Sequence, residues 1–248
     1  MLIGISGKMG SGKNLVCTII QGLTAAKKHN IENPSFEWIK KYYINSIWEQ
    51  KAFAGKLKQT VSLLTGIPVE KFEDQDFKNT ELGEEWWYWK PIGNDYLPLI
   101  PYNEPTGTNH YNLIKPTPRL LLQIIGTDCI RDRVHPNAWV NALFADYRDK
   151  VDFDNNLPKS SNWVITDMRF PNELEAVKSR GGITIRVNRF EQISENVRVH
   201  GVGVPHPSET ALDNAEFDYT IENDSSIEDL IHTVSLILKK EKNYLIWE

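Results

Sequence analysis

The sequence predicts an α/β fold, in which an open and mostly parallel sheet is flanked by helices. A short apolar strand over Leu2–Ser6 is followed by a glycine-rich turn and by apolar residues at helical spacing. Two further apolar runs, 163–165 and 183–187, lie on either side of a helical segment that Pro171 opens and Gly181 ends. Strands that alternate with helices in this way form parallel sheets, whose ligands bind at the carboxyl ends of the strands.

The remaining segments add helices and one irregular region. Helices are predicted over 56–64, 119–133 and 137–147, and Asn137 is suited to cap the last of them. Residues 69–118, first acidic and aromatic and then rich in proline, are expected to form a long inserted loop or a small subdomain. A strand over 217–221 and a terminal amphipathic helix complete the pattern. The chain, 1–248, is therefore expected to be a single domain with an insertion at about 69–118.

Composition excludes several classes of protein. The 248 residues include 28 basic and 33 acidic ones, for a net charge of −5, and no block of basic residues is present, which argues against nucleic-acid binding. No apolar run approaches the ~18 residues of a membrane span, so a soluble, cytoplasmic protein is expected. Cys17 and Cys129 both lie in helix-like apolar patterns, so both are expected to be buried free thiols.

Residues 7–14, GKMGSGKN, match the phosphate-binding pattern GxxxxGK between a predicted strand and a predicted helix. In that context glycines let backbone N–H groups turn toward phosphates, and Lys13 reaches the outer phosphate oxygens. A tight glycine turn without a ligand is the alternative, but it has no need of a lysine here. The pattern predicts a P-loop kinase fold whose ATP phosphates contact Lys8, Gly10, Ser11, Gly12, Lys13 and Asn14.

Asn14 stands where this pattern usually has Ser or Thr, whose hydroxyl binds Mg²⁺. An amide oxygen is a weaker substitute, so the protein ligands of the metal are unknown at this point. Mg²⁺ is still expected as the cofactor that accompanies ATP, held mainly by phosphates and waters.

Asp167 and Arg169 follow the strand predicted at 163–165, and both are expected to project toward the P-loop phosphates. Asp167 could orient Mg²⁺ through water or accept a hydrogen bond from a substrate, and Arg169 offers a two-pronged contact to phosphate. A structural ion pair that closes the strand–helix turn is the alternative. Lys13, Arg169 and Asp167 are the expected catalytic residues.

Four residues of the helix predicted at 119–133 lie at positions i, i+4, i+7 and i+8, and so share one face: Arg119, Gln123, Gly126 and Thr127. An arginine for phosphate and an amide for a base edge would suit a nucleotide, while a solvated polar face is the alternative. Trp139 could stack on a base or belong to the core.

Two further groups of residues, one polar and one aromatic, have simpler explanations than a functional site. Ser208 is expected to cap a helix, in preference to a hydrolytic set with His206 and Glu209. A platform for single-stranded nucleic acid is less favoured than local packing for the clustered tryptophans, Trp86, Trp87 and Trp89.

With these residues in place, the chain resembles the phage deoxynucleoside monophosphate kinases, which are relatives of adenylate kinase. The segments that carry the resemblance are GISGKMGSGK at 4–13, FAGKLK at 53–58, RLLLQIIGTD at 119–128, ITDMRFPNELEAV at 165–177 and HPSET at 206–210. The resemblance implies transfer of the ATP γ-phosphoryl group to a deoxynucleoside monophosphate (dNMP) in the host cytoplasm. It also implies a dNMP-binding role for Arg119, Gln123, Gly126, Thr127, Trp139, Asp167, Arg169 and Glu173.

ATP and a dNMP are thus the expected partners, and neither membrane nor nucleic acid is. Arg131, Arg133 and Arg189 are candidate lid or phosphate-contact arginines. The sequence leaves open the base specificity, the choice between ribose and deoxyribose, and the oligomeric state, a homodimer included. The alternatives are a P-loop kinase for a nucleoside or a coenzyme precursor, and a protein that binds ATP without kinase activity.

Overall fold

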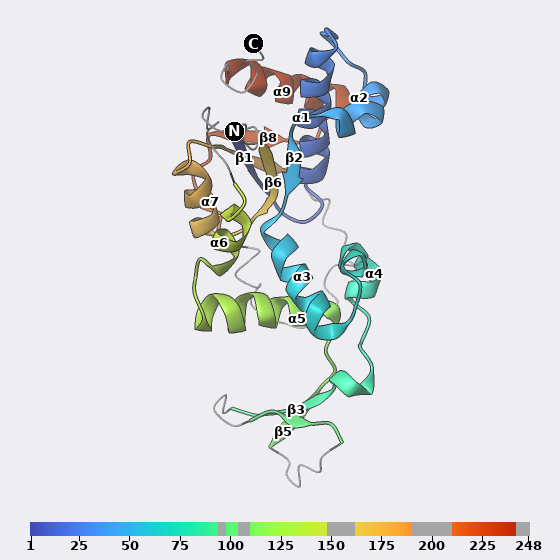
Figure 1. Cartoon of the computed structure of the whole chain (residues 1–248), viewed down its shortest axis with the longest axis vertical. Coiled ribbons are helices and arrows are strands. Elements are labelled where there is room, and N and C mark those ends of the chain that lie inside the picture. The colour runs from blue at the N-terminus through green and yellow to red at the C-terminus, as the bar shows by residue number, and fades with distance from the viewer. Residues whose placement is uncertain (94–97, 104–109, 148–161, 190–209, 242–248) are drawn as a thin grey trace, which may run out of the picture. The chain divides into compact units, whose positions relative to one another are not determined.

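The structure is a computed structural model that describes residues 1–93, 98–103, 110–147, 162–189 and 210–241 (Figure 1). The chain divides into two compact units. Unit 1 comprises Met1–Phe53 and Val140–Glu248, and unit 2 comprises Ala54–Trp139. Unit 2 contains the whole of the predicted insertion together with helical residues before and after it. The expectation of a single domain with an insertion stays a prediction.

Unit 1 is built on a parallel sheet of five strands in the order β2-β6-β1-β7-β8, which confirms the predicted α/β class. The strands are β1 Leu2–Ser6, β2 Glu49–Lys51, β6 Trp163–Met168, β7 Ile183–Asn188 and β8 Tyr219–Glu222. β6 extends three residues beyond the predicted run. β2 was not predicted, because an edge strand with polar, largely exposed side chains carries no apolar signal.

Helices cover both faces of this sheet (Figure 1). They are α1 Lys13–Lys28, α2 Phe36–Tyr42, α6 Ala138–Phe144, α7 Pro171–Lys178 and α9 Ile227–Lys240, with a 3-10 turn, η1, at Tyr43–Asn45. Ile3 and Ile5 pack toward the α1 and α9 side, whereas Leu2 packs toward the α6 and α7 side. This alternation is that of a strand buried on both faces. Each fully buried aliphatic side chain contributes about 1.5–3 kcal/mol to the hydrophobic stabilisation.

Helix ends in unit 1 follow local side-chain chemistry. Ser226 caps α9, since its hydroxyl accepts a hydrogen bond from the Asp229 N–H at 3.1 Å and the Asp229 carboxylate accepts one from the Ser226 N–H at 3.3 Å. α7 begins at Pro171 as predicted and is followed by a turn in which Gly181 has a φ of 69°. No helix among the described residues has both the length and the apolar composition of a membrane span.

Unit 2 combines short helices with a small antiparallel sheet in the order β4-β3-β5. Its elements are α3 Phe53–Thr65 (from Ala54 onward), η2 Val69–Glu73, α4 Gln75–Lys78, η3 Glu84–Trp86, β3 Tyr88–Pro91, β4 Ile100–Pro101, β5 Tyr111–Ile114, α5 Pro118–Gln123 and η4 Ile124–Arg131. Val61, Phe72 and Leu121 form its buried core. Trp87 and Trp89 donate their indole N–H groups to the carbonyls of Leu82 and Tyr102, as local packing predicts.

The helix predicted over 119–133 is not a regular α-helix. α5 ends at Gln123, and the next eight residues, η4, form a π-helix. A π-helix makes i to i+5 hydrogen bonds and has more residues in each turn. The spacing of Arg119, Gln123, Gly126 and Thr127 therefore spans an α-helix and a π-helix, and the expectation that they share one face stays a prediction.

The two cysteines differ in burial. Cys17 lies on α1 in the core of unit 1, where burial raises the pKa of its thiol to about 12. Cys129 lies on η4 and is exposed. The expectation that both thiols are buried is wrong for Cys129.

Candidate functional site

The glycine-rich loop of residues 7–12 joins the end of β1 to the start of α1. Gly10 and Gly12 have φ values of 81° and 98°, a left-handed conformation that favours glycine. A Cβ atom on Gly12 would also lie 2.4 Å from the amide nitrogen of Asn223. That nitrogen donates a hydrogen bond of 2.9 Å to the Ser11 carbonyl. Asn223, which follows β8, therefore holds the loop, and a larger residue at position 12 would have to displace the Asn223 side chain.

Lys13 folds back across this loop. Its Nζ donates hydrogen bonds to the carbonyls of Gly7 at 2.8 Å and Lys8 at 2.6 Å. Among the residues that the structure describes, the buried Ser11 hydroxyl has no hydrogen-bond partner. The first N–H groups of α1 lack acceptors within the helix, as at any helix start. The loop thus gathers donors and positive charge, which is the chemistry that phosphate requires.

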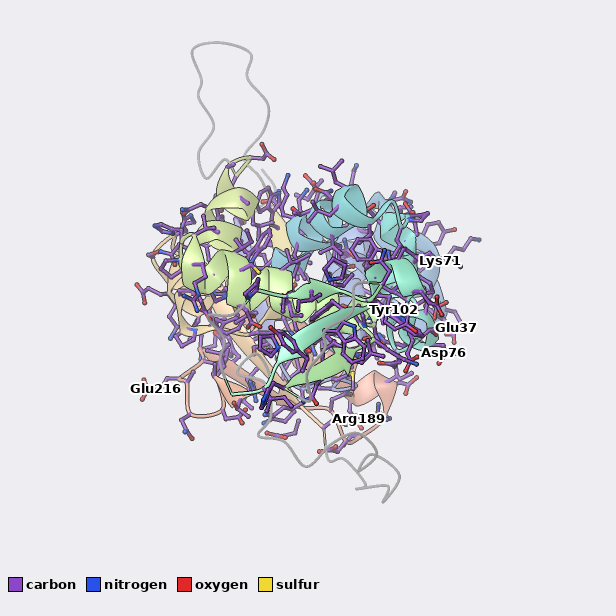
Figure 2. The ribbon with its side chains drawn as sticks, turned by 90° about the horizontal axis from the view of Figure 1, so that it is seen from below. Glu37, Lys71, Asp76, Tyr102, Arg189 and Glu216 are labelled. Atoms are coloured by element: carbon purple, nitrogen blue, oxygen red, sulfur yellow. The ribbon has the colours of Figure 1, made fainter. Side chains whose placement is uncertain are left out.

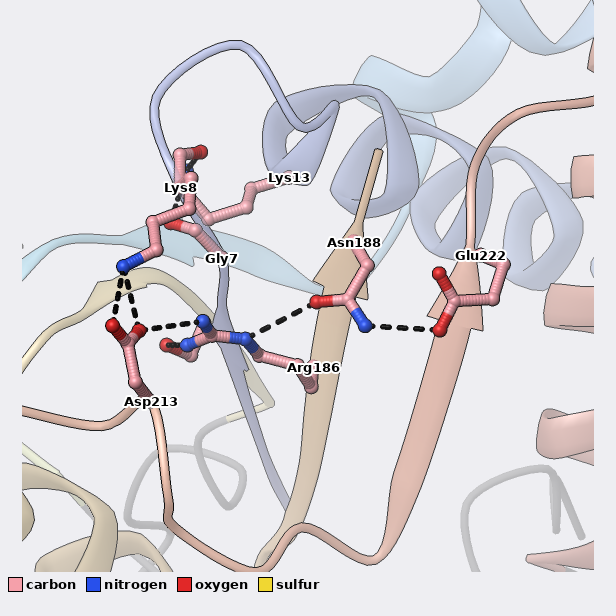
Figure 3. Close-up of polar contacts among 8 residues, drawn as sticks. Gly7, Lys8, Lys13, Arg186, Asn188, Asp213 and Glu222 are labelled. Atoms are coloured by element: carbon pink, nitrogen blue, oxygen red, sulfur yellow. Dashed lines mark hydrogen bonds and ion pairs between the residues drawn. The ribbon is translucent and has the colours of Figure 1, made fainter. Parts of the chain in front are cut away.

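A charged network lies beside the loop and links β1 and β7 to Asp213 (Figure 3). Lys8 Nζ lies 2.6 Å from Asp213 Oδ1, and Arg186 Nη2 donates to the same oxygen at 3.2 Å. Arg186 Nη1 also donates to the Ser6 hydroxyl at 3.2 Å. The hydrogen bond from Lys8 holds the pKa of Asp213 below its usual value, and Arg186 acts in the same direction. Lys8, an expected ATP-phosphate ligand, is thus paired with a carboxylate in this structure.

A small pocket of about 10 Å³, with room for about one water molecule, opens at the carboxyl ends of β1 and β6 and beside β7. Its lining consists of Ser6, Gly7, Lys8, Met168, Arg169, Arg186 and Leu212. Among the described residues, this lining has three cationic side chains and no carboxylate. The excess of positive charge suits an anionic ligand.

Asp167 and Arg169 are held at the end of β6 by their neighbours. Asp167 Oδ1 accepts a hydrogen bond from the Phe53 N–H at 2.8 Å. Glu173 Oε2 accepts hydrogen bonds from the N–H groups of Arg169 at 2.7 Å and Phe170 at 3.1 Å. Glu173 is only 2% exposed, so its carboxylate serves the start of α7 and fixes the Arg169 backbone. The dNMP-binding role expected for Glu173 stays a prediction.

Neutral oxygen atoms gather near Asn14, which is the first residue after Lys13. Gln50 Nε2, on β2, donates to Asn14 Oδ1 at 3.4 Å and to Thr166 Oγ1 at 3.3 Å. Within the described residues, no three His, Cys, Asp or Glu side chains gather as a metal site would require. Mg²⁺ is coordinated by oxygen ligands, which include amide and hydroxyl oxygens, so the side chains of Asn14 and Thr166 fit as its ligands.

Five of the residues expected to bind the dNMP belong to unit 2. Arg119 Nε donates to Asn79 Oδ1 at 2.9 Å, and Arg119 Nη2 donates to Gln75 Oε1 at 3.2 Å. Trp139 is 8% exposed, and its indole N–H donates to the Gly126 carbonyl at 2.8 Å. Gln123 and Thr127 are half-buried. The remaining expected dNMP residues, Asp167, Arg169 and Glu173, belong to unit 1 with the loop.

The candidate lid arginines differ in their surroundings. Arg131 Nη1 donates to the Pro136 carbonyl at 3.5 Å, whereas Arg133 and Arg189 are exposed. His206, Ser208 and Glu209 lie outside the described residues.

Sequence reasoning missed four residues that shape the site: Gln50, Arg186, Asp213 and Asn223. Arg186 offered a signal, since it is a charged residue within the apolar run at 183–187. Gln50 sits in an edge strand without apolar pattern, and Asp213 and Asn223 lie in short segments outside helices and strands. Their positions follow from the tertiary fold alone.

Comparison with known proteins gives consistent similarities. A family described as deoxynucleotide monophosphate kinase matches residues 108–234, just over half of the chain. The chain is 27% identical over 206 residues to the deoxynucleoside-5'-monophosphate kinase of Escherichia phage T5, and the alignment covers 72% of each chain. It is 24% identical over 253 residues to the deoxynucleotide monophosphate kinase of Enterobacteria phage T4, covering 96% of this chain and 98% of that one. The enzyme of Escherichia phage RB69 with the same name is 30% identical over 123 residues, covering 49% of this chain and 44% of its own.

Proposed function

The chain belongs to the deoxynucleotide monophosphate kinase family, and we propose that it transfers the γ-phosphoryl group of ATP to a dNMP, giving ADP and a deoxynucleoside diphosphate. The observation that carries this proposal is the glycine loop with Lys13, next to a pocket lined by Lys8, Arg169 and Arg186. Such a site supplies positive charge and backbone donors where phosphate groups must meet.

The reaction itself needs little covalent help from the protein. An oxygen of the dNMP phosphate attacks the γ-phosphorus of ATP, and the bond from that phosphorus to the β–γ bridging oxygen breaks. The bonding electron pair leaves with ADP. A phosphate monoester has a second pKa of about 6, so the attacking oxygen is largely deprotonated at neutral pH and needs no general base. Positioning and charge neutralisation are therefore what the residues supply.

Lys13, Arg169 and Asp167 are the residues we assign to this task. Lys13 Nζ now donates to two loop carbonyls, and it would offer the same N–H groups to the β- and γ-phosphate oxygens of ATP. Arg169 lines the pocket, and its guanidinium group would bind two oxygens of the dNMP phosphate in a bidentate contact. Asp167, tethered by the Phe53 N–H, would accept a hydrogen bond from the substrate or from a metal-bound water.

Residues of unit 2 are proposed to recognise the dNMP on the strength of the family resemblance: Arg119, Gln123, Gly126, Thr127 and Trp139. The side chain of Arg119 is oriented by Asn79 and Gln75, which favours a fixed contact. Trp139 is buried and holds the Gly126 carbonyl, which favours a role in shaping η4. Gln123 would then present its amide to a base edge.

We also propose Mg²⁺ as the cofactor, with Asn14 and Thr166 as the nearby oxygen donors. Bound with ATP, the ion would neutralise phosphate charge that builds up during transfer. The partners are then ATP and a dNMP, and the compartment proposed from the phage relatives is the host cytoplasm.

An acceptor panel tests this function. ADP release from ATP and Mg²⁺ would be measured with dAMP, dCMP, dGMP and dTMP, with their ribose counterparts, and with nucleosides. At least one dNMP should be phosphorylated with a higher kcat/KM than any nucleoside. Faster phosphorylation of a nucleoside, or ATP turnover that no acceptor stimulates, would refute the proposal and favour the alternatives named above.

A further inference from the structure

Arg186 occupies an unusual position for a charged residue. It lies on β7 opposite Ser6 of β1, in a strand whose neighbours Ile185 and Val187 are fully buried. Its side chain is 14% exposed and lines the pocket next to Gly7 and Lys8. A charged side chain in such a strand costs folding free energy unless the charge is paired. Arg186 is therefore expected to have either a structural or a ligand-binding role.

The partners of Arg186 hold its guanidinium in one orientation. Nη1 donates to the Ser6 hydroxyl at 3.2 Å and Nε donates to Asn188 Oδ1 at 3.4 Å. Asn188 is held in turn by Glu222, since its Nδ2 donates to Glu222 Oε1 at 2.9 Å (Figure 3). Nη2 meets Asp213 Oδ1 at 3.2 Å. The contacts with Ser6 and Asn188 are uncharged and orient the guanidinium. The contact with Asp213 is charged, and Lys8 binds the same oxygen of Asp213.

We propose that Arg186 is a further phosphate-binding residue of this enzyme, and that Asp213 holds Lys8 and Arg186 in the nucleotide-free state until a substrate phosphate displaces it. A carboxylate and a phosphate present similar oxygens to arginine and lysine, so one can replace the other. This inference rests on the proposed function and names two residues beyond those the resemblance carries over.

The exposure of the network makes such an exchange feasible. The side chains of Lys8 and Asp213 are 44% and 37% exposed, so their ion pair is weak and opens readily in water. A phosphate monoester carries about two negative charges at neutral pH against the single charge of a carboxylate. The pocket lining, with three cations and no carboxylate among the described residues, favours the more highly charged anion.

Removal of the Asp213 charge gives the sharpest test. Asp213→Asn keeps the size of the side chain and one acceptor oxygen, and residue 213 is exposed, so the fold should be retained. Glu216→Gln is the matched control, because it removes a carboxylate from an outward-pointing side chain three residues away (Figure 2). Binding of ATP and of a dNMP would be measured separately by calorimetry, so that no turnover occurs.

Asp213→Asn should lower the Kd of at least one substrate by roughly threefold to tenfold, because a competing charge is lost. Tighter binding of ATP would assign the pocket to the donor phosphate, and tighter binding of the dNMP would assign it to the acceptor phosphate. Glu216→Gln should leave both Kd values unchanged. Unchanged or weaker binding of both substrates by Asp213→Asn would overturn the proposal and mark the network as structural.

Substitution of Arg186 completes the test. Arg186→Lys keeps the charge and lowers the risk of unfolding, and it should raise by about tenfold the Kd of the substrate that Asp213→Asn binds more tightly. When Arg186→Lys and Asp213→Asn are combined, the fall in Kd caused by Asp213→Asn should become smaller, since the two residues act on one phosphate. If the wild-type protein phosphorylates no dNMP, the proposed function is refuted. The calorimetric Kd values for ATP would still decide whether Arg186 binds phosphate.

Discussion

The two units of the molecule position their functional residues by different means. In unit 1 a five-stranded parallel sheet, buried on both faces, holds the loop and the pocket at the ends of its strands. Unit 2 has a small core of Val61, Phe72 and Leu121, and its antiparallel sheet includes a strand of two residues. Side-chain hydrogen bonds hold residues in both units, as Asn223 does at the Ser11 carbonyl in unit 1. In unit 2 fewer buried apolar side chains support such bonds, so the smaller unit depends more on each of them.

The π-helix η4 shows this dependence most clearly. A π-turn is rarer than an α-turn and is frequent at functional sites. Here the Trp139 indole N–H donates a hydrogen bond to the Gly126 carbonyl. A Cβ atom on Gly126 would lie 2.7 Å from the side chain of Leu57. One buried tryptophan and one leucine side chain thus constrain η4 at Gly126. Substitutions should therefore act on chemistry in unit 1 and on local order in unit 2.

The largest contrast is expected between the two cysteines. Burial raises the pKa of Cys17, in unit 1, to about 12, whereas Cys129, in unit 2, is exposed. At pH 8 about one Cys17 thiol in 10⁴ would be ionised, and the thiolate is the reactive form. Iodoacetamide should modify Cys129 at least about 10³-fold faster, as measured by peptide mass spectrometry. Comparable rates would mean that the core around α1 opens freely.

Lys13→Ala should lower kcat by about 10²-fold or more, because a charge contact to the transferring phosphoryl group is lost. Lys28→Ala, at the exposed far end of the same helix, is the control and should keep normal turnover. Circular dichroism should be unchanged for both variants. Near-normal turnover of Lys13→Ala would refute the phosphate role of the loop.

Arg169→Lys should reduce kcat/KM for the dNMP by roughly tenfold to a hundredfold, or about 1.4 to 2.8 kcal/mol, since an ammonium loses the two-pronged contact. The Kd of ATP should change much less. Arg180→Lys, outside the pocket, serves as the control. An equal loss of ATP and dNMP binding together with a lower Tm would instead indicate a structural ion pair at the end of β6.

Trp139→Phe should leave the Gly126 carbonyl without its buried donor, which costs about 1–2 kcal/mol. Amides of η4 should then exchange hydrogen roughly fivefold to thirtyfold faster, a readout of local opening. Trp87→Phe loses a similar bond, to the Leu82 carbonyl in the same unit, and should leave η4 exchange unchanged. Equal exchange in both variants would show that Trp139 does not hold the π-helix.

Asn14→Ser should produce the smallest change. A hydroxyl restores the usual Mg²⁺ ligand, so the Mg²⁺ concentration for half-maximal rate should fall by roughly twofold to fivefold. Asn14→Ala should move that concentration in the opposite direction. No change in either variant would leave the hydrogen bond that Asn14 accepts from Gln50 as its whole role.

Local sequence signals predicted most of unit 1 and much less of unit 2. Apolar runs, Pro171 and the glycine loop indicated four of the five strands of the described parallel sheet, α7 and the P-loop, because these features follow from backbone rules that act over a few residues. The antiparallel strands at 88–91 and 111–114 carry no such pattern, and the π-helical turn cannot be read from α-helical spacing.

The candidate site was predicted in its loop but not in its surroundings. Lys13 and Arg169 belong to motifs, and so they could be named from sequence. Asp213 and Asn223 reach the loop from segments about 200 residues away, and their contacts with Lys8 and Ser11 arise only when β7 and β8 complete the sheet. Long-range pairing of this kind leaves no periodic signal in a single sequence.

The fate of the transferred phosphate tests the central claim most directly. Wild-type protein would be incubated with γ-³²P-labelled ATP, Mg²⁺ and each of the four dNMPs, and the products would be separated by thin-layer chromatography. We predict that label enters the β-position of a deoxynucleoside diphosphate, that little appears as inorganic phosphate, and that Lys13→Ala slows the transfer by about 10²-fold or more. Label found only as inorganic phosphate, or retained in ATP with every dNMP, would contradict the account.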